Sequence, residues 1–133
     1  MASVSLQLTQ HASTSMKLEH DQFSIIVDRP ESKGGGGQGL MGGQYLLIGV
    51  GGCFCSNLFA AAQARSIEIE GLSVGIQADL SEDARKSFSR IELRVSYTSC
   101  SDEAEFPKLI RIAEKGCLSV NTLLKGAEVQ VLG

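Results

Sequence analysis

Residues 45–65 read YLLIGVGGCFCSNLFAAAQAR, a stretch in which nearly every position is apolar or small. On a helix these apolar side chains would fall on every face, so the pattern predicts a long helix that is buried all round. A small domain can bury such a helix by packing one side against its own sheet and the other against a second subunit. Gly49, Gly51 and Gly52 would permit close approach, at about 1 kcal/mol each in helix propensity.

The same stretch is also long enough to cross a bilayer. It carries polar side chains at Ser56, Asn57 and Gln63, and segments with the pattern of soluble strands lie on both sides of it. Polar groups are costly inside a membrane. We therefore favour a core helix and expect no membrane association.

The segments before this helix predict a three-stranded antiparallel meander. Apolar and polar residues alternate over 3–9, 16–19 and 23–27, the period of half-buried strands. The polar residues 28–33 and the sequence GGGGQGLMGG at 34–43 then predict a mobile loop at the helix entrance. Gly34, Gly36 and Gly39 match a dinucleotide-binding spacing, but such matches are almost automatic in a glycine run.

The segments after the helix predict two paired strands at 72–80 and 90–97, joined across 81–87. An acidic start at 101–105 and an apolar stripe indicate a helix with Pro107 in its first turn. Ser119 is the expected cap of a short helix that ends at Gly126, and Val129 and Val131 mark a last strand. The predicted order is βββ-α-ββ-α-α-β, a single α+β domain over 1–133.

Composition limits the possible functions. The 133 residues are 43% hydrophobic and 20% charged, with a net charge of −3, as in an ordinary soluble domain. Lys and Arg are dispersed, so we expect no nucleic-acid partner. The start MASVSLQLTQ has no basic and apolar export signal, which favours the cytoplasm, where cysteines stay thiols.

Two cysteines are candidates for chemistry. Cys53 lies inside the apolar helix, where a buried structural thiol is the alternative explanation. Cys117 lies where one helix stops and the next begins, close to free backbone N–H groups that are expected to lower its pKa. If the fold brings the two sulfurs together, they form a redox centre that contains its own resolving thiol.

The remaining cysteines and histidines offer no second site. Cys55 is rotated by about 200° from Cys53 on a helix, so the two cannot clamp a metal or form a local disulfide. Cys100, in a polar segment, is expected to be an exposed thiol without a role. His11 and His20 have no acidic residue at a triad spacing. We expect neither a metal nor a cofactor.

Two segments resemble the OsmC/Ohr family of osmotically induced and organic hydroperoxide resistance proteins, which act in stress responses. They are YLLIGVGGCFCSNLFAA and FPKLIRIAEKGCLSVNTLLKGAEVQV, which begin at Tyr45 and Phe106. The resemblance implies an OsmC-like fold in an intertwined homodimer whose interface holds both thiols. It assigns Cys53 as the peroxidatic and Cys117 as the resolving cysteine of a thiol peroxidase. A small organic hydroperoxide, fatty or aromatic, would oxidise Cys53 to a sulfenic acid, Cys117 would form a disulfide with it, and an external dithiol would reduce that disulfide.

The sequence departs from the family pattern at the groups that stabilise the thiolate. Peroxidase members carry an Arg after the first strand and a Glu at the start of the long helix; here the loop has His11 and the helix entrance has Gly43 and Gln44. Arg29, with His11 second, is the nearest substitute. Without a cation, a buried Cys53 is expected to have a raised pKa. The alternative function is therefore a non-enzymatic OsmC-like protein that binds a small apolar ligand or senses oxidation.

Overall fold

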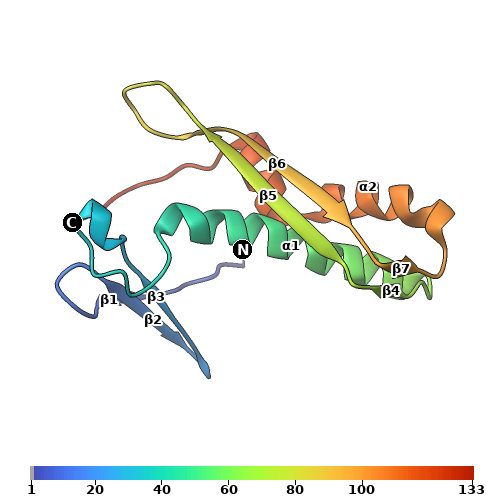
Figure 1. Cartoon of the computed structure of the whole chain (residues 1–133), viewed down its shortest axis with the longest axis horizontal. Helices are drawn as coiled ribbons and strands as arrows, with labels where there is room; N and C mark the ends of the chain where they lie inside the picture. The colour runs from blue at the N-terminus through green and yellow to red at the C-terminus, as the bar shows by residue number, and fades with distance from the viewer. Residues whose placement is uncertain (1) are drawn as a thin grey trace. The chain divides into compact units, whose positions relative to one another are not determined.

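The computed structural model describes residues 2–133 (Figure 1), which divide into two compact units, the first up to Leu46 and the second over Leu47–Gly133. The long helix α1 (Gly42–Ala64) begins in the first unit and runs on through the second. The expectation of one domain over 1–133 stays a prediction.

The first unit contains the predicted antiparallel meander. Its strands β1 (Leu8–Gln10), β2 (Met16–His20) and β3 (Phe23–Val27) pair in that order, with Leu18 opposite both Leu8 and Ile25. The predicted start of the first strand is wrong, because Val4 and Leu6 precede β1 and Val4 is 91% exposed. The pairing of β1 with β2 begins at Leu8 and Leu18, and β2 continues to His20 with no β1 residue opposite Glu19 or His20, so alternation alone does not make a strand here.

The glycine-rich segment is organised around the buried carboxylate of Asp28. It accepts hydrogen bonds from the Thr14 hydroxyl (2.9 Å) and from the N–H groups of Arg29 (2.7 Å), Gly36 (3.2 Å) and Gln38 (3.2 Å). Burial alone would raise the pKa of Asp28, but these hydrogen bonds outweigh it and hold the pKa below its usual value. The sequence predicted a mobile loop. Instead, the buried Asp28 carboxylate accepts hydrogen bonds from the N–H groups of the loop and gives it a defined conformation.

Helix α1 starts earlier than predicted because Gln44 caps it. The Gln44 Oε1 atom accepts the N–H of Met41 at 2.9 Å, the returning half of a capping box. Within the single chain one side of the helix stays exposed, with Ile48 49% and Phe59 44% exposed, so its expected burial against a second subunit stays a prediction. The helix has the length and mean hydropathy (1.6) of a membrane span, properties that core helices share. Its buried face consists of Val50, Gly51, Phe54, Leu58, Ala61 and Ala62.

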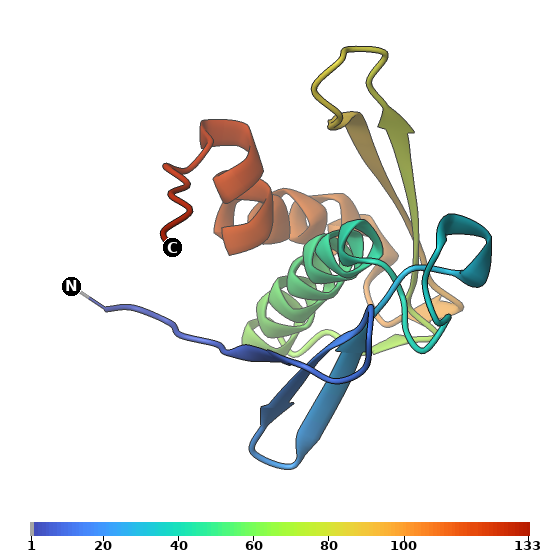
Figure 2. The ribbon, with the colours of Figure 1, turned by 90° about the vertical axis from the view of Figure 1, so that its left-hand side faces the viewer.

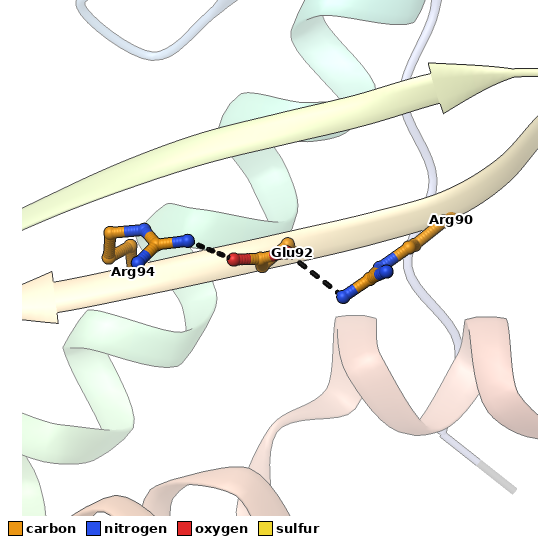
Figure 3. Close-up of polar contacts among 3 residues, drawn as sticks. All are labelled: Arg90, Glu92 and Arg94. Carbon is orange, nitrogen blue, oxygen red and sulfur yellow. Dashed lines mark hydrogen bonds and ion pairs between the residues drawn. The ribbon is translucent and has the colours of Figure 1, made fainter.

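The predicted hairpin after α1 is confirmed. Strands β5 (Ser73–Leu80) and β6 (Phe88–Ser96) pair antiparallel, and the short strands β4 (Ile69–Glu70) and β7 (Ser99–Cys100), which the sequence did not predict, form a second pair. On β6 the charged side chains of Arg90, Glu92 and Arg94 alternate with Ile91, Leu93 and Val95. Figure 3 shows Glu92 between the two arginines, with which it forms exposed ion pairs. Such pairs add little stability, but they mark the solvated face of the hairpin.

The second unit ends in two helices, as predicted. After the 3₁₀ turn η2 (Glu103–Glu105), α2 (Phe106–Gly116) carries Pro107 in its first turn, and α3 (Leu118–Lys125) follows. The predicted last strand is absent: residues 126–133 form no strand, and Val129 and Val131 are exposed. No strand of the described chain pairs with this segment, so its alternating pattern has no sheet to join.

The core of the second unit lies where α1 meets α2 and the β5–β6 hairpin. Figure 2 shows α1 flanked by both elements. Gly51 is required there, because a Cβ at this position would lie 2.5 Å from Ile76 Cδ1. Leu58 and Leu109 have no exposed surface, and burial of such a side chain contributes about 1.5–3 kcal/mol. The buried cluster consists of Phe54, Leu58, Ala61, Ala62, Ile67, Phe106, Leu109, Ala113 and Cys117.

Candidate functional site

The structure brings Cys53 and Cys117 together in the second unit. Cys117, between α2 and α3, has a side chain that is 0% exposed and belongs to the buried cluster. Cys53, on α1, is half-buried and packs against the same cluster. Each thiol influences the pKa of the other, since Cys117 helps to lower that of Cys53 and Cys53 helps to raise that of Cys117, so the two sulfurs lie close together. Two cysteines far apart in the sequence therefore form one site.

The first turn of α3 faces the sulfur of Cys53. Cys117 is the N-cap of α3, so the N–H groups of Leu118, Ser119 and Val120 have no partner within the helix. The Ser119 N–H and then the Ser119 hydroxyl are the strongest influences that lower the pKa of Cys53. Burial opposes them, and the Cys117 thiol and the Leu118 N–H assist. The expectation that burial would raise the pKa of Cys53 is wrong, because these donors outweigh desolvation.

The pKa of Cys117 moves in the opposite direction. Burial raises it most, and the neighbouring Cys53 raises it further, while the N–H groups of Val120 and Ser119 act against this rise. The sequence predicted a lowered pKa at this helix junction. That prediction is wrong because the Cys117 sulfur points into the core, whereas Cys53 reaches the helix N-terminus from α1. The pair is thus asymmetric, with the thiolate favoured on Cys53 and the thiol on Cys117.

Asn57 contacts Cys53 from one turn further along α1. Its Nδ2 atom donates to the Cys53 carbonyl oxygen at 2.9 Å and lies 3.8 Å from the Cys53 sulfur. On its other side, a Cβ built on Gly116 would lie 3.2 Å from Asn57 Oδ1. The amide therefore fits between the cysteine and the end of α2.

A groove of about 530 Å³ lies beside this site in the second unit. It is bounded by residues adjacent to the site, Phe54 after Cys53 and Val120 after Ser119, and by one face of β6. Its surface is mostly apolar, with Arg90 and Glu114 among its few charged residues. The lining residues are Val50, Phe54, Phe88, Ser89, Arg90, Ile91, Leu93, Val95, Ile110, Glu114, Val120, Leu123 and Leu124.

The family model described as OsmC-like protein matches residues 35–131, well over half of the chain. The chain belongs to the OsmC-like protein family. The resemblance seen in the sequence is thereby confirmed, and membership is consistent with a redox or peroxide-resistance role. No curated protein matches the sequence.

Solved structures show the same mixed α+β OsmC-like fold. An OsmC-like protein from Mycoplasma pneumoniae is 23% identical with a TM-score of 0.76, over 94% of this chain and 89% of that one. An organic hydroperoxide resistance protein OsmC from Legionella pneumophila, described as a predicted redox protein and regulator of sulfide bond formation, is 21% identical with a TM-score of 0.68, over 92% and 91%. An organic hydroperoxide resistance protein from Elizabethkingia anophelis is 17% identical with a TM-score of 0.68, over 96% and 93%. At these identities the likeness shows the fold alone.

The other predicted site residues of this OsmC-like chain belong to the first unit. Arg29 is exposed, and its carbonyl oxygen accepts the Gly37 N–H at 2.9 Å. His11 is exposed too, and its backbone N–H donates to the backbone carbonyl oxygen of Ser15 at 2.9 Å. Gly43 and Gln44 lie in the first turn of α1. Cys53 belongs to the second unit, so the roles of Arg29 and His11 in thiolate stabilisation stay predictions.

Two residues beside Cys53 in the candidate site, and one other thiol, differ from what the sequence predicts. Ser119 was expected to cap α3, but Cys117 is the N-cap and Ser119 lies in the first turn. Asn57 was treated only as a polar interruption, although its spacing of four from Cys53 places both on one helix face. Cys100 was expected to be exposed; it is half-buried in β7, and its thiol donates to the Asp102 carbonyl oxygen at 3.4 Å.

Proposed function

We propose that this OsmC-like protein is a thiol peroxidase that reduces organic hydroperoxides, with Cys53 as the peroxidatic and Cys117 as the resolving cysteine. One observation carries the proposal: Cys53 packs against the buried cluster that contains Cys117, and the pKa of Cys53, the more accessible of the two thiols, is lowered. A nucleophilic thiol must be ionised and reachable, whereas its resolving partner only needs to lie within bonding reach.

The proposed reaction has three steps. The Cys53 thiolate attacks the distal oxygen of ROOH, the O–O bond breaks, Cys53 becomes a sulfenic acid, and the alkoxide takes a proton to leave as ROH. The Cys117 sulfur then attacks the Cys53 sulfur, and its proton leaves with the hydroxyl as water while the disulfide forms. An external dithiol supplies the two electrons and two protons that restore both thiols and is itself oxidised to a disulfide.

The groove beside the site supports an organic rather than an inorganic peroxide. Its lining is mostly apolar, so a hydrocarbon or aromatic group gains free energy by leaving water there. Hydrogen peroxide has no such group. We therefore place fatty and aromatic hydroperoxides first among the substrates, with the organic part of the molecule along Phe54 and Val120.

The proposal also covers the residues that would assist the Cys53 thiolate and the oligomeric state of the protein. Arg29, with His11 second, would add positive charge near the thiolate, and Gly43 and Gln44 would shape the helix entrance. A cytoplasmic, intertwined homodimer would cover the apolar side of α1 that this chain leaves exposed, which includes Ile48 and Phe59.

The groove also favours a second candidate function. A cavity of about 530 Å³ with an apolar lining has the size and surface of small-molecule sites. The protein would then bind an apolar ligand, or sense oxidation, without turnover. In that case ligand-linked thermal stabilisation would survive Cys53→Ser.

Thiol titration against cumene hydroperoxide separates the two functions. The wild type should lose two thiols per peroxide rapidly, Cys117→Ser one, and Cys53→Ser none, while the matched control Cys100→Ser should behave as wild type. With a dithiol, only proteins that retain both Cys53 and Cys117 should turn over through a disulfide. Thiol loss no faster than in the urea-unfolded chain would end the peroxidase proposal.

A further inference from the structure

We propose that Asn57 and Ser119 hold the Cys53 sulfur as a thiolate between α1 and α3 with uncharged hydrogen-bond donors. The proposal rests on the proposed function only in taking Cys53 as the reactive thiol. It assigns the stabilisation of the anion to two side chains that flank the sulfur in the second unit.

Asn57 provides the donor from α1. Its Nδ2 atom is fixed at 2.9 Å from the Cys53 carbonyl oxygen, and the same NH₂ group lies 3.8 Å from the Cys53 sulfur. An amide has two N–H donors, so one can serve the carbonyl while the other is directed at the sulfur. A donor bound to its own helix keeps its place whether the sulfur is charged or neutral.

Gly116 provides the space for this amide. A Cβ at Gly116 would lie 3.2 Å from Asn57 Oδ1, closer than ordinary van der Waals contact. A side chain at residue 116 would therefore push the Asn57 amide by a few tenths of an ångström. Cys117 follows Gly116 directly, so the amide lies next to the junction that carries the second thiol.

Ser119 provides the donors from α3. As the second residue of the helix it has a backbone N–H without an intrahelical acceptor, at the positive end of the helix dipole. Its N–H and hydroxyl lower the pKa of Cys53 more than any other group. The sulfur thus has donors from two helices, an arrangement equivalent to the oxyanion holes that stabilise negative charge with preorganised neutral groups.

Among the described residues, the titratable group that influences the pKa of Cys53 is the Cys117 thiol, at the junction of α2 and α3. The contacts from Asn57, Leu118 and Ser119 carry no charge. Stabilisation by neutral donors at short range should resist salt, whereas the effect of an exposed cation such as Arg29 is screened at about 1 M salt, where the Debye length is about 3 Å.

The test measures the pH dependence of Cys53 alkylation by iodoacetamide in the full-length protein, with peptide mass spectrometry to count adducts on Cys53. Asn57→Asp, which is nearly isosteric, should move the midpoint upward and slow alkylation at pH 7 by about tenfold, because a carboxylate would lie beside the thiolate. Ser119→Ala keeps its N–H and should slow it about threefold. Ser56→Ala and Thr122→Ala are the matched controls from the same helices and should leave the profile unchanged.

Two results would overturn the proposal. One is an unchanged midpoint in both Asn57→Asp and Ser119→Ala. The other is an alkylation midpoint that moves in Arg29→Ala or His11→Ala but not in Asn57→Asp or Ser119→Ala. In that case the midpoint of the wild type would also shift by a similar amount at about 1 M salt. Because alkylation needs no peroxide, these outcomes are independent of whether the protein turns over hydroperoxides.

Discussion

The N–H and hydroxyl of Ser119, in the first turn of α3, lower the pKa of Cys53 most, although Cys53 lies on a different helix, α1. The cysteine at the N-cap of that turn, Cys117, keeps its own sulfur in the core and its pKa raised. In the proposed mechanism, this difference makes Cys53 the thiol that reacts first.

The thiolate of Cys53 should make stability depend on pH. Because folding lowers the pKa of Cys53, its ionisation favours the folded state above the ordinary thiol pKa, and this contribution is lost as pH falls through the lowered value. The difference in free energy of unfolding between wild type and Cys53→Ser, measured by urea titration, should therefore grow as pH rises through that window. A difference that stays constant with pH would contradict the lowered pKa.

Reduction of the proposed disulfide should begin at the Cys53 sulfur. Cys117 is fully buried, so a thiol cannot approach its sulfur in line, whereas Cys53 is half-exposed. Oxidised protein treated briefly with glutathione and quenched with acid should carry the mixed disulfide on Cys53, as shown by peptide mapping. Glutathione found mainly on Cys117 would show that the core opens before reduction.

The free energy of unfolding should depend strongly on Leu109 and weakly on Leu124. Leu109 is 0% and Leu124 77% exposed, although both lie in the second unit. Leu109→Ala should lower the free energy of unfolding by about 2–5 kcal/mol. Leu124→Ala should change it by less than about 0.5 kcal/mol. Chemical denaturation measures both, and equal losses would contradict the described core.

Asp28 should hold the glycine-rich segment in place. Asp28→Asn removes the charge that accepts four hydrogen bonds, so proteolysis within residues 31–39 should become faster. Glu31 is exposed, and the control variant Glu31→Gln should be cleaved at the rate of the wild type. Since folding lowers the pKa of Asp28, the stabilisation is present above the ordinary carboxyl pKa and is lost as pH falls through the lowered one. Identical cleavage rates in all three proteins would contradict this role.

The exposed side of α1 should mediate self-association. Phe59, 44% exposed in the chain, would lie in the proposed dimer interface, so Phe59→Lys should shift the protein from dimer to monomer in light scattering. Gln63→Lys places the same charge on an exposed position near the end of the helix and is the control. A monomeric wild type at micromolar concentration would rule out the dimer.

The sequence predicted the helices and strands whose hydrophobic pattern depends only on residues nearby in the chain. The meander, α1, the β5–β6 hairpin and α2 follow from local periodicity and turn residues. The predicted strands at residues 4–6 and 129–131 are wrong, because alternation alone does not supply the hydrogen-bonded partner that a strand needs.

Prediction of the candidate site from the sequence is limited in the same way. Cys53 and Cys117 were found by residue type and position, but the direction of each pKa shift depends on where the sulfurs point. A linear pattern cannot show that Cys53 reaches the N–H of Ser119 or that Cys117 turns into the core. Asn57 could have been found from its spacing to Cys53, since residues four apart share a helix face.

The most direct measurement is peptide mapping of the native protein after one equivalent of cumene hydroperoxide, under conditions that block free thiols at once. The predicted product is a disulfide that joins the Cys53 and Cys117 peptides, with Cys55 and Cys100 recovered as blocked thiols. Cys53 and Cys117 recovered as blocked thiols, with the peroxide unconsumed, would contradict the peroxidase chemistry proposed for this pair.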